Sequence, residues 1–336
     1  MKDTYRGIFL CFAIVLASAF SGDQVAAFGE GSWSDSILCS LGVRSVQVAP
    51  YVRVGYQRMT VNLNVPIGGY GDPVQFTWND MDVKLEKQEF LIGTLGVNTL
   101  IRQRFGFFAE ASASAQRAGS VTTVFTNLAV PGVPTNPTGW SWPSQRVQWL
   151  ELNLGGTVNV GDSGVLLLGY KFDRLTQGLT NPPNAYVFPT LNQNDFGDLD
   201  IRTWSPYIGV RFDDRLWRFD LIWSPWLTSY SAQMPLRWTA YNAVEQLALE
   251  ARYGLSGGGG NLLEAYGEGK FNIFELLAAK LWLKASWLNC RGNGKRDFVG
   301  YDAFGGPPLQ SSGSDSALGS LTTYLWAFGL AGEITF

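Results

Sequence analysis

The chain has 336 residues, of which 46% are hydrophobic, 14% aromatic and only 16% charged. The absence of histidine excludes histidine base catalysis and any metal site with a histidine ligand, and the aromatic content argues against a disordered chain. The 25 basic and 28 acidic residues give a net charge of −3, so no basic surface for nucleic acid is indicated.

The first residues have the pattern of a secretory signal peptide. Lys2 and Arg6 precede an apolar run over residues 8–20, and the small residues Val25-Ala26-Ala27 follow it. The run is too short to span a bilayer as a helix. We therefore predict a signal peptide over residues 1–27, with Ala17-Ser18-Ala19 as a second candidate cleavage site. Residues 28–44 would then form a short periplasmic segment before the main domain, residues 45–336.

The rest of the chain has no apolar run long enough for a membrane helix and instead shows a repeated alternation with a period of two. In the last segment, Tyr324, Trp326 and Phe328 lie on one face, and small or polar residues lie on the other. This period is that of β-strands. Ten strands are expected, near residues 45–65, 82–101, 105–118, 146–160, 164–174, 201–213, 216–226, 261–273, 276–289 and 321–336.

The polar faces of these strands decide between two architectures. A soluble β-sandwich would bury the apolar faces and expose the polar ones. Here charges of both signs recur at facing depths on many strands, which suits a barrel interior with the apolar faces against lipid. Together with the export signal, this pattern predicts an all-β fold: a transmembrane, antiparallel, up-and-down β-barrel in the bacterial outer membrane.

The connections between strands alternate in length. Short turns are expected near residues 102–104, 161–163, 213–215 and 272–275, and long connections near 66–81, 119–145, 175–200, 227–260 and 290–320. In outer-membrane barrels short turns face the periplasm and long loops face outside, so both chain ends should be periplasmic. Residues 243–253 could instead add strand pieces or a short helix, and twelve strands remain an alternative.

A ten-stranded barrel is narrow, since eight strands just close around side chains and general porins need about 16. Cations and carboxylates in similar number should therefore pair in the lumen and block it, although a small water-filled passage is the alternative. The predicted lumen charge network comprises Glu110, Glu151, Lys171, Arg211, Asp220, Glu264, Glu268, Lys270, Lys280 and Lys284.

The C-terminal segment from Tyr324 to Phe336 has alternate aromatics and ends in phenylalanine. It resembles the terminal signature of single-chain bacterial outer-membrane barrels, which implies recognition by the outer-membrane assembly machinery. The ten-strand arrangement further resembles the omptins, the outer-membrane surface proteases, and the pattern from Ser205 to Trp226 is similar to an omptin strand pair. The likeness covers about residues 82–336, as topology.

The resemblance does not extend to the protease chemistry. The omptin active site needs an Asp-Asp pair and an Asp-His pair, and this chain has no histidine. The stretches from Ser120 to Asn127 and from Leu227 to Asn242 also contain no acidic residue. Lipase and deacylase barrels that use a histidine base are excluded for the same reason. We therefore expect a non-enzymatic barrel.

One cation lies on the lipid-facing side near the outer end of each of five consecutive predicted strands. These cations are Lys87, Arg117, Arg146, Arg174 and Arg202. A charge on the lipid face costs about 2–4 kcal/mol at the membrane midplane and little at the interface, so these side chains should lie at headgroup level. Arginine matches phosphate geometry, and our hypothesis is contact with lipopolysaccharide; ordinary snorkelling is the alternative.

Other features are interpreted more simply. We expect interfacial aromatics at Trp204, Trp217, Trp223, Trp287, Tyr324 and Trp326, with a stacking platform for sugars as the alternative. Trp140 and Trp142 are expected to cap the barrel mouth, with contact to a partner or a glycan as the alternative. The polar residues at 192–200 fit no calcium loop, so neither a metal nor a cofactor is expected. Cys39 and Cys290 should lie at opposite ends of the barrel, too far apart for a disulfide.

The sequence thus predicts a structural or surface-binding outer-membrane barrel associated with lipid and lipopolysaccharide. A small-solute pore is the main alternative, and a divergent surface enzyme that uses carboxylates or a Ser-Lys pair is a third.

Overall fold

The computed structural model describes residues 46–71, 77–101, 104–127, 138–143, 145–160, 164–178, 198–214, 216–241, 246–274, 277–302 and 309–334. The predicted signal peptide and periplasmic segment lie outside these residues. The elements are β1 (Val46–Gly71), β2 (Thr77–Ile101), β3 (Phe105–Asn127), β4 (Thr138–Pro143), β5 (Gln145–Val160), β6 (Gly164–Gly178), β7 (Asp198–Asp213), β8 (Trp217–Tyr241), β9 (Gln246–Phe274), β10 (Leu277–Asp302) and β11 (Leu309–Ile334). No helix in the described part is long and apolar enough to cross a membrane.

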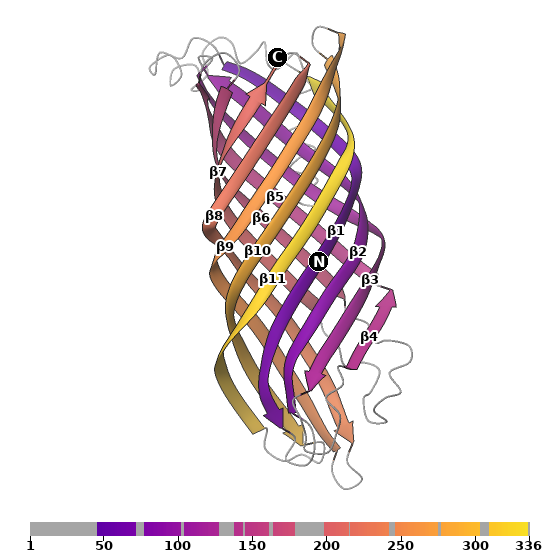
Figure 1. Ribbon diagram of the computed structural model, residues 1–336. Coiled ribbons are helices and arrows are strands. Elements are labelled where there is room, and N and C mark those ends of the chain that lie inside the picture. The colour runs from indigo at the N-terminus through magenta and orange to yellow at the C-terminus, as the bar shows by residue number, and fades with distance from the viewer. Residues whose placement is uncertain are drawn as a thin grey trace, which may run out of the picture. The chain divides into compact units, whose positions relative to one another are not determined.

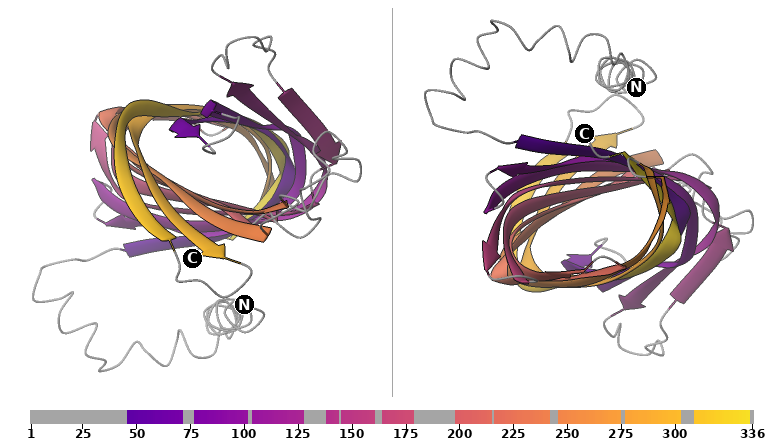
Figure 2. Two further views of the ribbon diagram at one scale, coloured as in Figure 1. Left: turned by 90° about the horizontal axis from the view of Figure 1, so that it is seen from below. Right: turned by 90° about the horizontal axis from the view of Figure 1, so that it is seen from above.

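Ten of these strands form one closed antiparallel barrel. Each strand pairs with its neighbours in the ring order β1-β2-β3-β5-β6-β7-β8-β9-β10-β11, and β11 pairs with β1 to complete the ring. The short β4 pairs with β3 alone. The strands are tilted and surround a single lumen (Figures 1 and 2). The predicted ten-strand, all-β barrel is confirmed.

The strands extend much further than the sequence pattern indicated. Residues 227–260 were expected as a long connection, with a twelve-strand barrel as the alternative. Most of them instead continue β8 and β9, which pair with each other up to Tyr241 and Gln246. The same holds for β10 and β11, which pair up to Gly300 and Leu309. Ten strands therefore account for these segments, and the predicted long loops there were wrong.

The two ends of the barrel differ (Figure 1). At one end, which we call the turn end, only two or three residues separate β2 from β3, β5 from β6, β7 from β8 and β9 from β10, and β11 also ends there. At the opposite end, which we call the hairpin end, β8 and β9, and β10 and β11, continue as long paired hairpins. The two ends therefore suit different surroundings.

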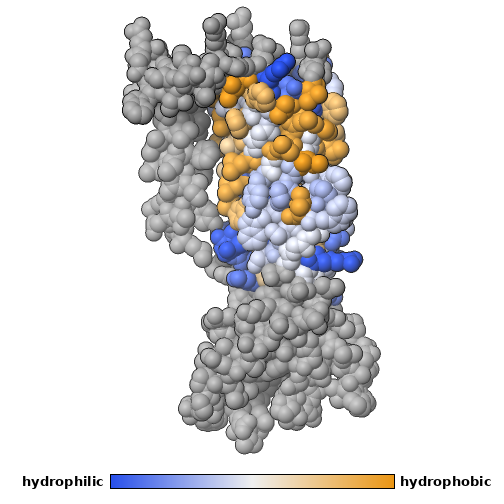
Figure 3. Space-filling view, turned by 90° about the vertical axis from the view of Figure 1, so that its left-hand side faces the viewer, coloured by the Kyte–Doolittle hydropathy of each residue, from blue (hydrophilic) through white to orange (hydrophobic). Residues whose placement is uncertain are grey.

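The outer face of the barrel wall changes from apolar to polar along its length. On β1 the exposed outward residues near the turn end are Val48, Val52 and Val54, whereas the outward positions nearer the hairpin end hold Arg58, Thr60 and Asn62. The same change occurs after Tyr170 and Phe172 on β6, where Arg174 follows. Figure 3 shows apolar side chains gathered toward the turn end of one face, followed by side chains of intermediate hydropathy and then by strongly hydrophilic ones.

We call the level of this change the polarity boundary. The outward residues that mark it are Arg58 on β1, Lys87 on β2, Arg174 on β6, Arg202 on β7, Ser229 on β8, Asn289 on β10 and Thr322 on β11. The apolar side suits contact with lipid and the polar side suits contact with water. The strand predictions ended near this level because the outward apolar residues end there, although the strands continue.

The interior changes in the opposite sense. Toward the turn end it holds the charged residues described below, whereas toward the hairpin end it is a packed apolar cluster. Buried members of this cluster are Met59, Val61, Leu63, Leu85, Phe90, Trp149, Leu199, Tyr230, Leu262 and Leu321. The predicted lumen charge network therefore occupies the part of the lumen toward the turn end, and the apolar cluster beyond it was not predicted. Beyond the polarity boundary the outside is polar, so apolar residues are buried inside, as in a soluble protein.

Candidate functional site

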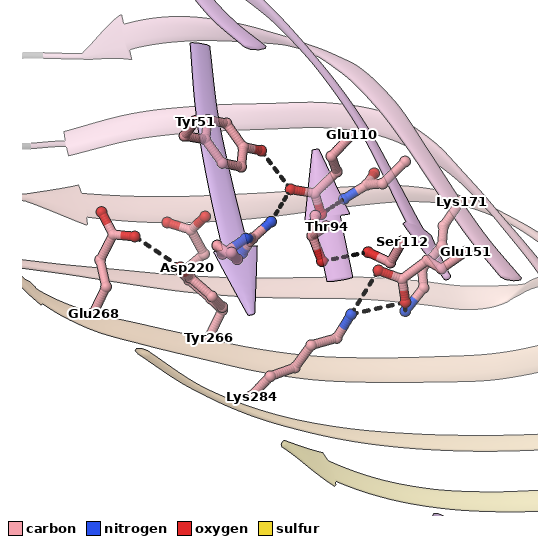
Figure 4. Close-up of polar contacts among 12 residues, drawn as sticks. Tyr51, Thr94, Glu110, Ser112, Glu151, Lys171, Asp220, Tyr266, Glu268 and Lys284 are labelled. Carbon is pink, nitrogen blue, oxygen red and sulfur yellow. Dashed lines mark hydrogen bonds and ion pairs between the residues drawn. The ribbon is translucent and has the colours of Figure 1, made fainter. Parts of the chain in front are cut away.

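A ring of four buried charges crosses the lumen on the turn-end side of the apolar cluster. Lys171 Nζ lies 2.5 Å from Glu264 Oε2 and 2.8 Å from Glu151 Oε2. Lys284 Nζ lies 2.8 Å from both carboxylate oxygens of Glu151 and 3.2 Å from Glu264 Oε2. Glu151 on β5 and Lys284 on β10 come from opposite sides of the barrel, five strands apart in either direction, and their contact spans the lumen (Figure 4).

A second group packs beside this ring. Glu110 accepts hydrogen bonds from the Tyr51 hydroxyl, at 2.5 Å, and from the Arg53 guanidinium. Asn153 donates to Glu110 at 3.3 Å and accepts from the Tyr207 hydroxyl at 2.7 Å. The Arg53 guanidinium also lies over aromatic rings, 5.0 Å from the centroid of Tyr51. Charge and aromatic contacts thus hold one connected layer in place.

A third group lies toward the turn end. Asp220 accepts from Arg211, with Nε at 2.9 Å, and from Arg218. Lys280 Nζ lies 3.0 Å from Glu268 and 2.7 Å from Glu333. Lys270 Nζ pairs with Asp213 at 2.6 Å. Every residue of the predicted lumen charge network therefore faces inward and has a hydrogen-bond or ion-pair partner: Glu110, Glu151, Lys171, Arg211, Asp220, Glu264, Glu268, Lys270, Lys280 and Lys284.

Cavities remain between the side chains inside the described part of the barrel. A cavity of about 50 Å³ lies between Arg53, Glu110, Glu151 and Lys284. A larger one, about 310 Å³, lies toward the turn end and is lined by Arg211, Lys270, Lys280 and Glu333 among others. The first has room for one or two water molecules. On its far side lies the apolar cluster, so packed side chains occupy the lumen at the charged ring and beyond it.

A different arrangement lies on the outer wall at the polarity boundary. Asp200 accepts hydrogen bonds from Arg174 Nε and Nη2, at 3.1 and 2.9 Å, and from Arg202 Nε and Nη2, at 3.3 and 2.7 Å. Arg174 on β6 and Arg202 on β7 are direct partners in the strand register. We call these three residues the arginine–aspartate triad. It places two cations beside one anion.

The triad remains accessible and charged. The side chains of Arg174 and Arg202 are 38% and 43% exposed. Nη1 of each guanidinium makes no hydrogen bond within the described part of the chain, so it can donate to another acceptor. Partial burial raises the pKa of the Asp200 carboxyl, but hydrogen bonds from Arg202 and Arg174 outweigh burial and hold that pKa below its usual range. Asp200 is therefore ionised at neutral pH and fixes both guanidiniums.

The aromatic side chains of Phe172 and Trp204 adjoin the triad on its turn-end side. They are partners in the strand register, two positions from the Arg174–Arg202 pair, and their ring centroids are 5.9 Å apart. An amphiphile with an anionic headgroup would meet cations and aromatic rings in this order. The site thus combines charge-assisted hydrogen-bond donors with apolar surface at the level where the wall changes polarity.

The remaining predicted lipopolysaccharide contacts lie elsewhere on the ring. Lys87 is exposed at a bulge of β2, three strands from Arg174. Arg117 and Arg146 lie within β3 and β5, and their side chains are outside the described part. The structure thus joins Arg174 to Arg202, while Lys87 stands apart.

Asp200, which links the triad, was not identified from the sequence as part of it. The signal was present in Asp200-Ile201-Arg202, because residues two apart share one face of a strand. Cys290 is a free, buried thiol in the apolar cluster, and Cys39 lies outside the described residues. Within the described part, no group of three or more acidic or cysteine side chains is arranged to hold a metal ion.

Comparisons with known proteins reveal a shared fold. No protein-family model matches the chain, and no curated protein matches it. The crystal structure of the outer membrane protease OmpT from Escherichia coli is similar with a TM-score of 0.54 and 14% identity, over 86% of this chain and 97% of that one. At this identity the likeness shows the fold alone.

Two other barrels are similar at lower TM-scores. The translocator domain of the autotransporter NalP from Neisseria meningitidis has a TM-score of 0.32 and 8% identity, over 93% of this chain and 99% of that one. A Pseudomonas aeruginosa FadL homologue has a TM-score of 0.27 and 10% identity, over 86% and 90%. The closed barrel, with exposed apolar residues on its outer wall, and the fold that it shares with OmpT are those of an integral protein of the bacterial outer membrane.

Proposed function

We propose that this chain is a non-enzymatic outer-membrane barrel whose outer wall binds lipopolysaccharide. The hairpin end faces outward, and the arginine–aspartate triad lies among the headgroups of the outer leaflet. The observation that carries the proposal is the pair of guanidiniums that Asp200 holds side by side at the polarity boundary. Arginine binds phosphate through several directed hydrogen bonds, which makes such a pair suited to a phosphorylated lipid.

Snorkelling of two independent arginines would explain where the triad lies. It would not explain the hydrogen bonds that hold Arg174 and Arg202 to Asp200. Snorkelling needs only that the charged group reach water. Here Asp200 holds each guanidinium by two hydrogen bonds from Nε and Nη2. A fixed pair loses less side-chain entropy when it binds a ligand than two free arginines would lose. This preorganisation supports a binding site.

The non-enzymatic part of the proposal rests on composition and on the interior. The chain has no histidine, and the charged residues of the lumen are engaged with one another in buried pairs. Toward the hairpin end the described interior is mainly a packed apolar cluster that also holds the buried amides of Gln88 and Gln177, and an amide is neither a nucleophile nor a general base. A peptide-cleavage assay on the refolded protein would contradict this part of the proposal if turnover were observed.

The alternative function, a small-solute pore, is supported by the cavity of about 310 Å³ toward the turn end. The charged ring and the apolar cluster argue against it, because both occupy the lumen between that cavity and the hairpin end. Conductance of the refolded protein in a planar bilayer distinguishes the two functions. We expect no steady channels, and steady channels would favour the pore.

Lipopolysaccharide co-purification tests the leading proposal. The double change Arg174→Gln and Arg202→Gln removes both cations and keeps polar side chains of similar length. We expect it to lower the lipopolysaccharide retained per protein by about tenfold, as loss of about 1.4 kcal/mol of binding would. Arg104→Gln, which removes an exposed cation at the turn end, is the matched control and should retain the wild-type amount. Unchanged retention in the double variant would defeat the proposal.

A further inference from the structure

Two neighbouring strands are irregular at the same level of the outer wall. On β8, Pro225, Trp226 and Leu227 lie between the pairs Ser224–Leu262 and Thr228–Gly260, so three residues stand opposite Asn261 alone. On β9, Gly258 and Gly259 lie between the pairs Thr228–Gly260 and Tyr230–Gly257. Such bulges redirect side chains and occur preferentially beside functional sites.

The β8 bulge presents an aromatic side chain in an unfavourable backbone conformation. Trp226 has a φ of 53°, in the left-handed region that bulky residues rarely adopt. Its N–H donates to the Asn261 side-chain oxygen at 3.1 Å, which holds the bulge in place. The Trp226 side chain is 69% exposed and that of Leu227 58%. Trp217, Trp287 and Trp326, by contrast, lie on regular strands and are less exposed.

The glycines of β9 leave an uncovered floor beside Trp226. Gly258 and Gly259 are exposed, and a Cβ added at Gly258 would meet no atom within 4 Å. Gly259 has a φ of 87°, which a glycine adopts without strain. Because β9 lies between β8 and β10, its missing side chains leave bare backbone between those two strands, which lie about 10 Å apart, and we call this stretch the trough.

Polar residues border the trough on its other sides. Arg291 on β10 is exposed and has no carboxylate partner among the described residues. Asn261 on β9 and Asn289 on β10 are partners in the strand register on the turn-end side. The trough, defined by Trp226, Gly258, Gly259, Asn261, Asn289 and Arg291, thus combines an aromatic ring, two amides and one exposed cation around a bare backbone floor.

We propose that this trough binds a sugar ring that carries an anionic substituent, as part of the headgroup of an outer-leaflet glycolipid. The exposed indole can stack on the apolar face of a sugar, and the two amides can hydrogen-bond its hydroxyl groups. Arg291 can pair with the anionic substituent. The glycine floor lets the ring approach the wall closely. An acyl chain fits less well, because it would offer no polar partner to the Asn289 amide, to the NH2 group of Asn261 or to the Arg291 guanidinium.

The position of the trough supports a membrane glycolipid as the source of the sugar. The trough lies at the polarity boundary, between outward Trp223 and Trp287 on one side and outward Ser231 on the other. This is the level at which lipid headgroups meet the wall. The trough lies on β8, β9 and β10 and shares no residue with the arginine–aspartate triad on β6 and β7, although β7 and β8 are paired neighbours. The proposal of a sugar site rests on the proposed function in one respect, namely that the hairpin end faces outward.

Titration of the refolded full-length protein with lipopolysaccharide, and separately with phosphatidylglycerol, tests the proposal by isothermal calorimetry. The triad stays intact in every variant, so that failure of the trough and failure of the triad are separable. We expect Trp226→Ala, Arg291→Gln and the trough-filling Gly258→Val each to weaken lipopolysaccharide binding by about tenfold. Binding of phosphatidylglycerol, which has an anion but no sugar ring, should be unchanged in Trp226→Ala and Gly258→Val.

Two matched controls keep the result interpretable. Trp217→Ala removes another exposed tryptophan from the same strand, and Gly93→Val adds a side chain at an exposed glycine that also has no atom within 4 Å of an added Cβ. Both should bind lipopolysaccharide as the wild type does. Folding of each variant is checked by its gel mobility without boiling. Wild-type affinity in both Trp226→Ala and Gly258→Val, or an equal loss for both lipids, would overturn the proposal.

Discussion

The turn-end half and the hairpin half of the barrel are made of the same strands but place polar and apolar side chains on opposite faces. In the turn-end half Leu166 and Leu168 of β6 are exposed, while Lys171 is buried inside. In the hairpin half of the same strand Arg174 lies outside and Leu175 is buried inside. The outer surroundings therefore decide what the inside must be. A barrel interior is polar where the outside is apolar, and it reverts to an ordinary core where the outside is wet.

The difference also separates two sources of stability. Toward the hairpin end, apolar side chains such as Phe90 and Leu262 are removed from water by the wall itself, and the hydrophobic effect supplies the free energy. Toward the turn end the outward residues remain in apolar lipid whether or not the lumen is well packed. There the interior depends on ion pairs whose partners come from distant strands, as Glu151 and Lys284 do.

The largest expected effect is the loss of one member of the charged ring. Glu151→Gln removes the carboxylate that both Lys171 and Lys284 contact at 2.8 Å, and leaves two buried cations with fewer anions. Removal of one partner of a buried pair costs about 3–5 kcal/mol. We expect the free energy of unfolding to fall by that amount, as measured by urea titration in detergent micelles with tryptophan fluorescence.

The exposed pair between Lys84 and Glu86, beyond the polarity boundary, is the matched control. These side chains are 49% and 35% exposed, and a surface ion pair contributes about 0–1 kcal/mol. Glu86→Gln should therefore leave the unfolding midpoint almost unchanged. Equal losses in the two variants would mean that the lumen is more hydrated than its burial indicates, and the contrast between the two halves would fail.

A second test locates the polarity boundary along one strand. Leu154 and Gln148 both face outward on β5, with Leu154 in the apolar region and Gln148 beyond it. Leu154→Arg should cost about 2–4 kcal/mol, because it sets a charge against lipid, whereas Gln148→Arg should cost about 0–1 kcal/mol. Both are measured by reversible unfolding in lipid vesicles. Similar losses in the free energy of unfolding at the two positions would mean that the polarity boundary does not lie between Gln148 and Leu154 on β5.

The ten strands and their faces near the turn end were predictable because alternation there is strong. Leu150, Leu152 and Leu154 alternate with Glu151 and Asn153, so the outward and the inward face can both be assigned from the sequence. The continuation of the strands was not predictable, because the apolar residues change face at the boundary and the pattern then loses its phase. On β9 the glycines at 257–260 remove the pattern altogether.

The candidate sites were predictable only in part, and the reason is register. Alternation correctly set Arg174 and Arg202 on the outer face, but nothing in one strand shows that the two are direct partners across β6 and β7. The contact of Asp200 with Arg202 has a local signal, whereas its contact with Arg174 follows from that register. The bulge at Trp226 also has no local signal, since tryptophan is among the residues least expected at a positive φ.

The triad gives a smaller effect that depends on pH. Asp200→Asn removes the anion that separates two adjacent cations, and we expect a loss of stability below about 1 kcal/mol because the arginines are partly exposed. The folded-state pKa of Asp200 is lowered, so its contribution is present above the usual aspartate pKa of about 3.9 and is lost as the pH falls through the folded value. Unfolding curves of wild type and variant should therefore differ at pH 7 and converge in acid. A difference that grows in acid would contradict this account.

The smallest effect concerns the bulge at Lys87, which lies at the polarity boundary on β2. Its φ of 50° is unfavourable for a residue with a Cβ, so Lys87→Gly should raise the free energy of unfolding by about 0.5–1 kcal/mol. Lys84→Gly on the same strand has no positive φ to relieve and should lower it by about 0.5–1 kcal/mol. Urea titrations of the two variants, run side by side, should thus shift in opposite directions. Shifts of the same sign would mean that Lys87 does not adopt a positive φ in the folded protein.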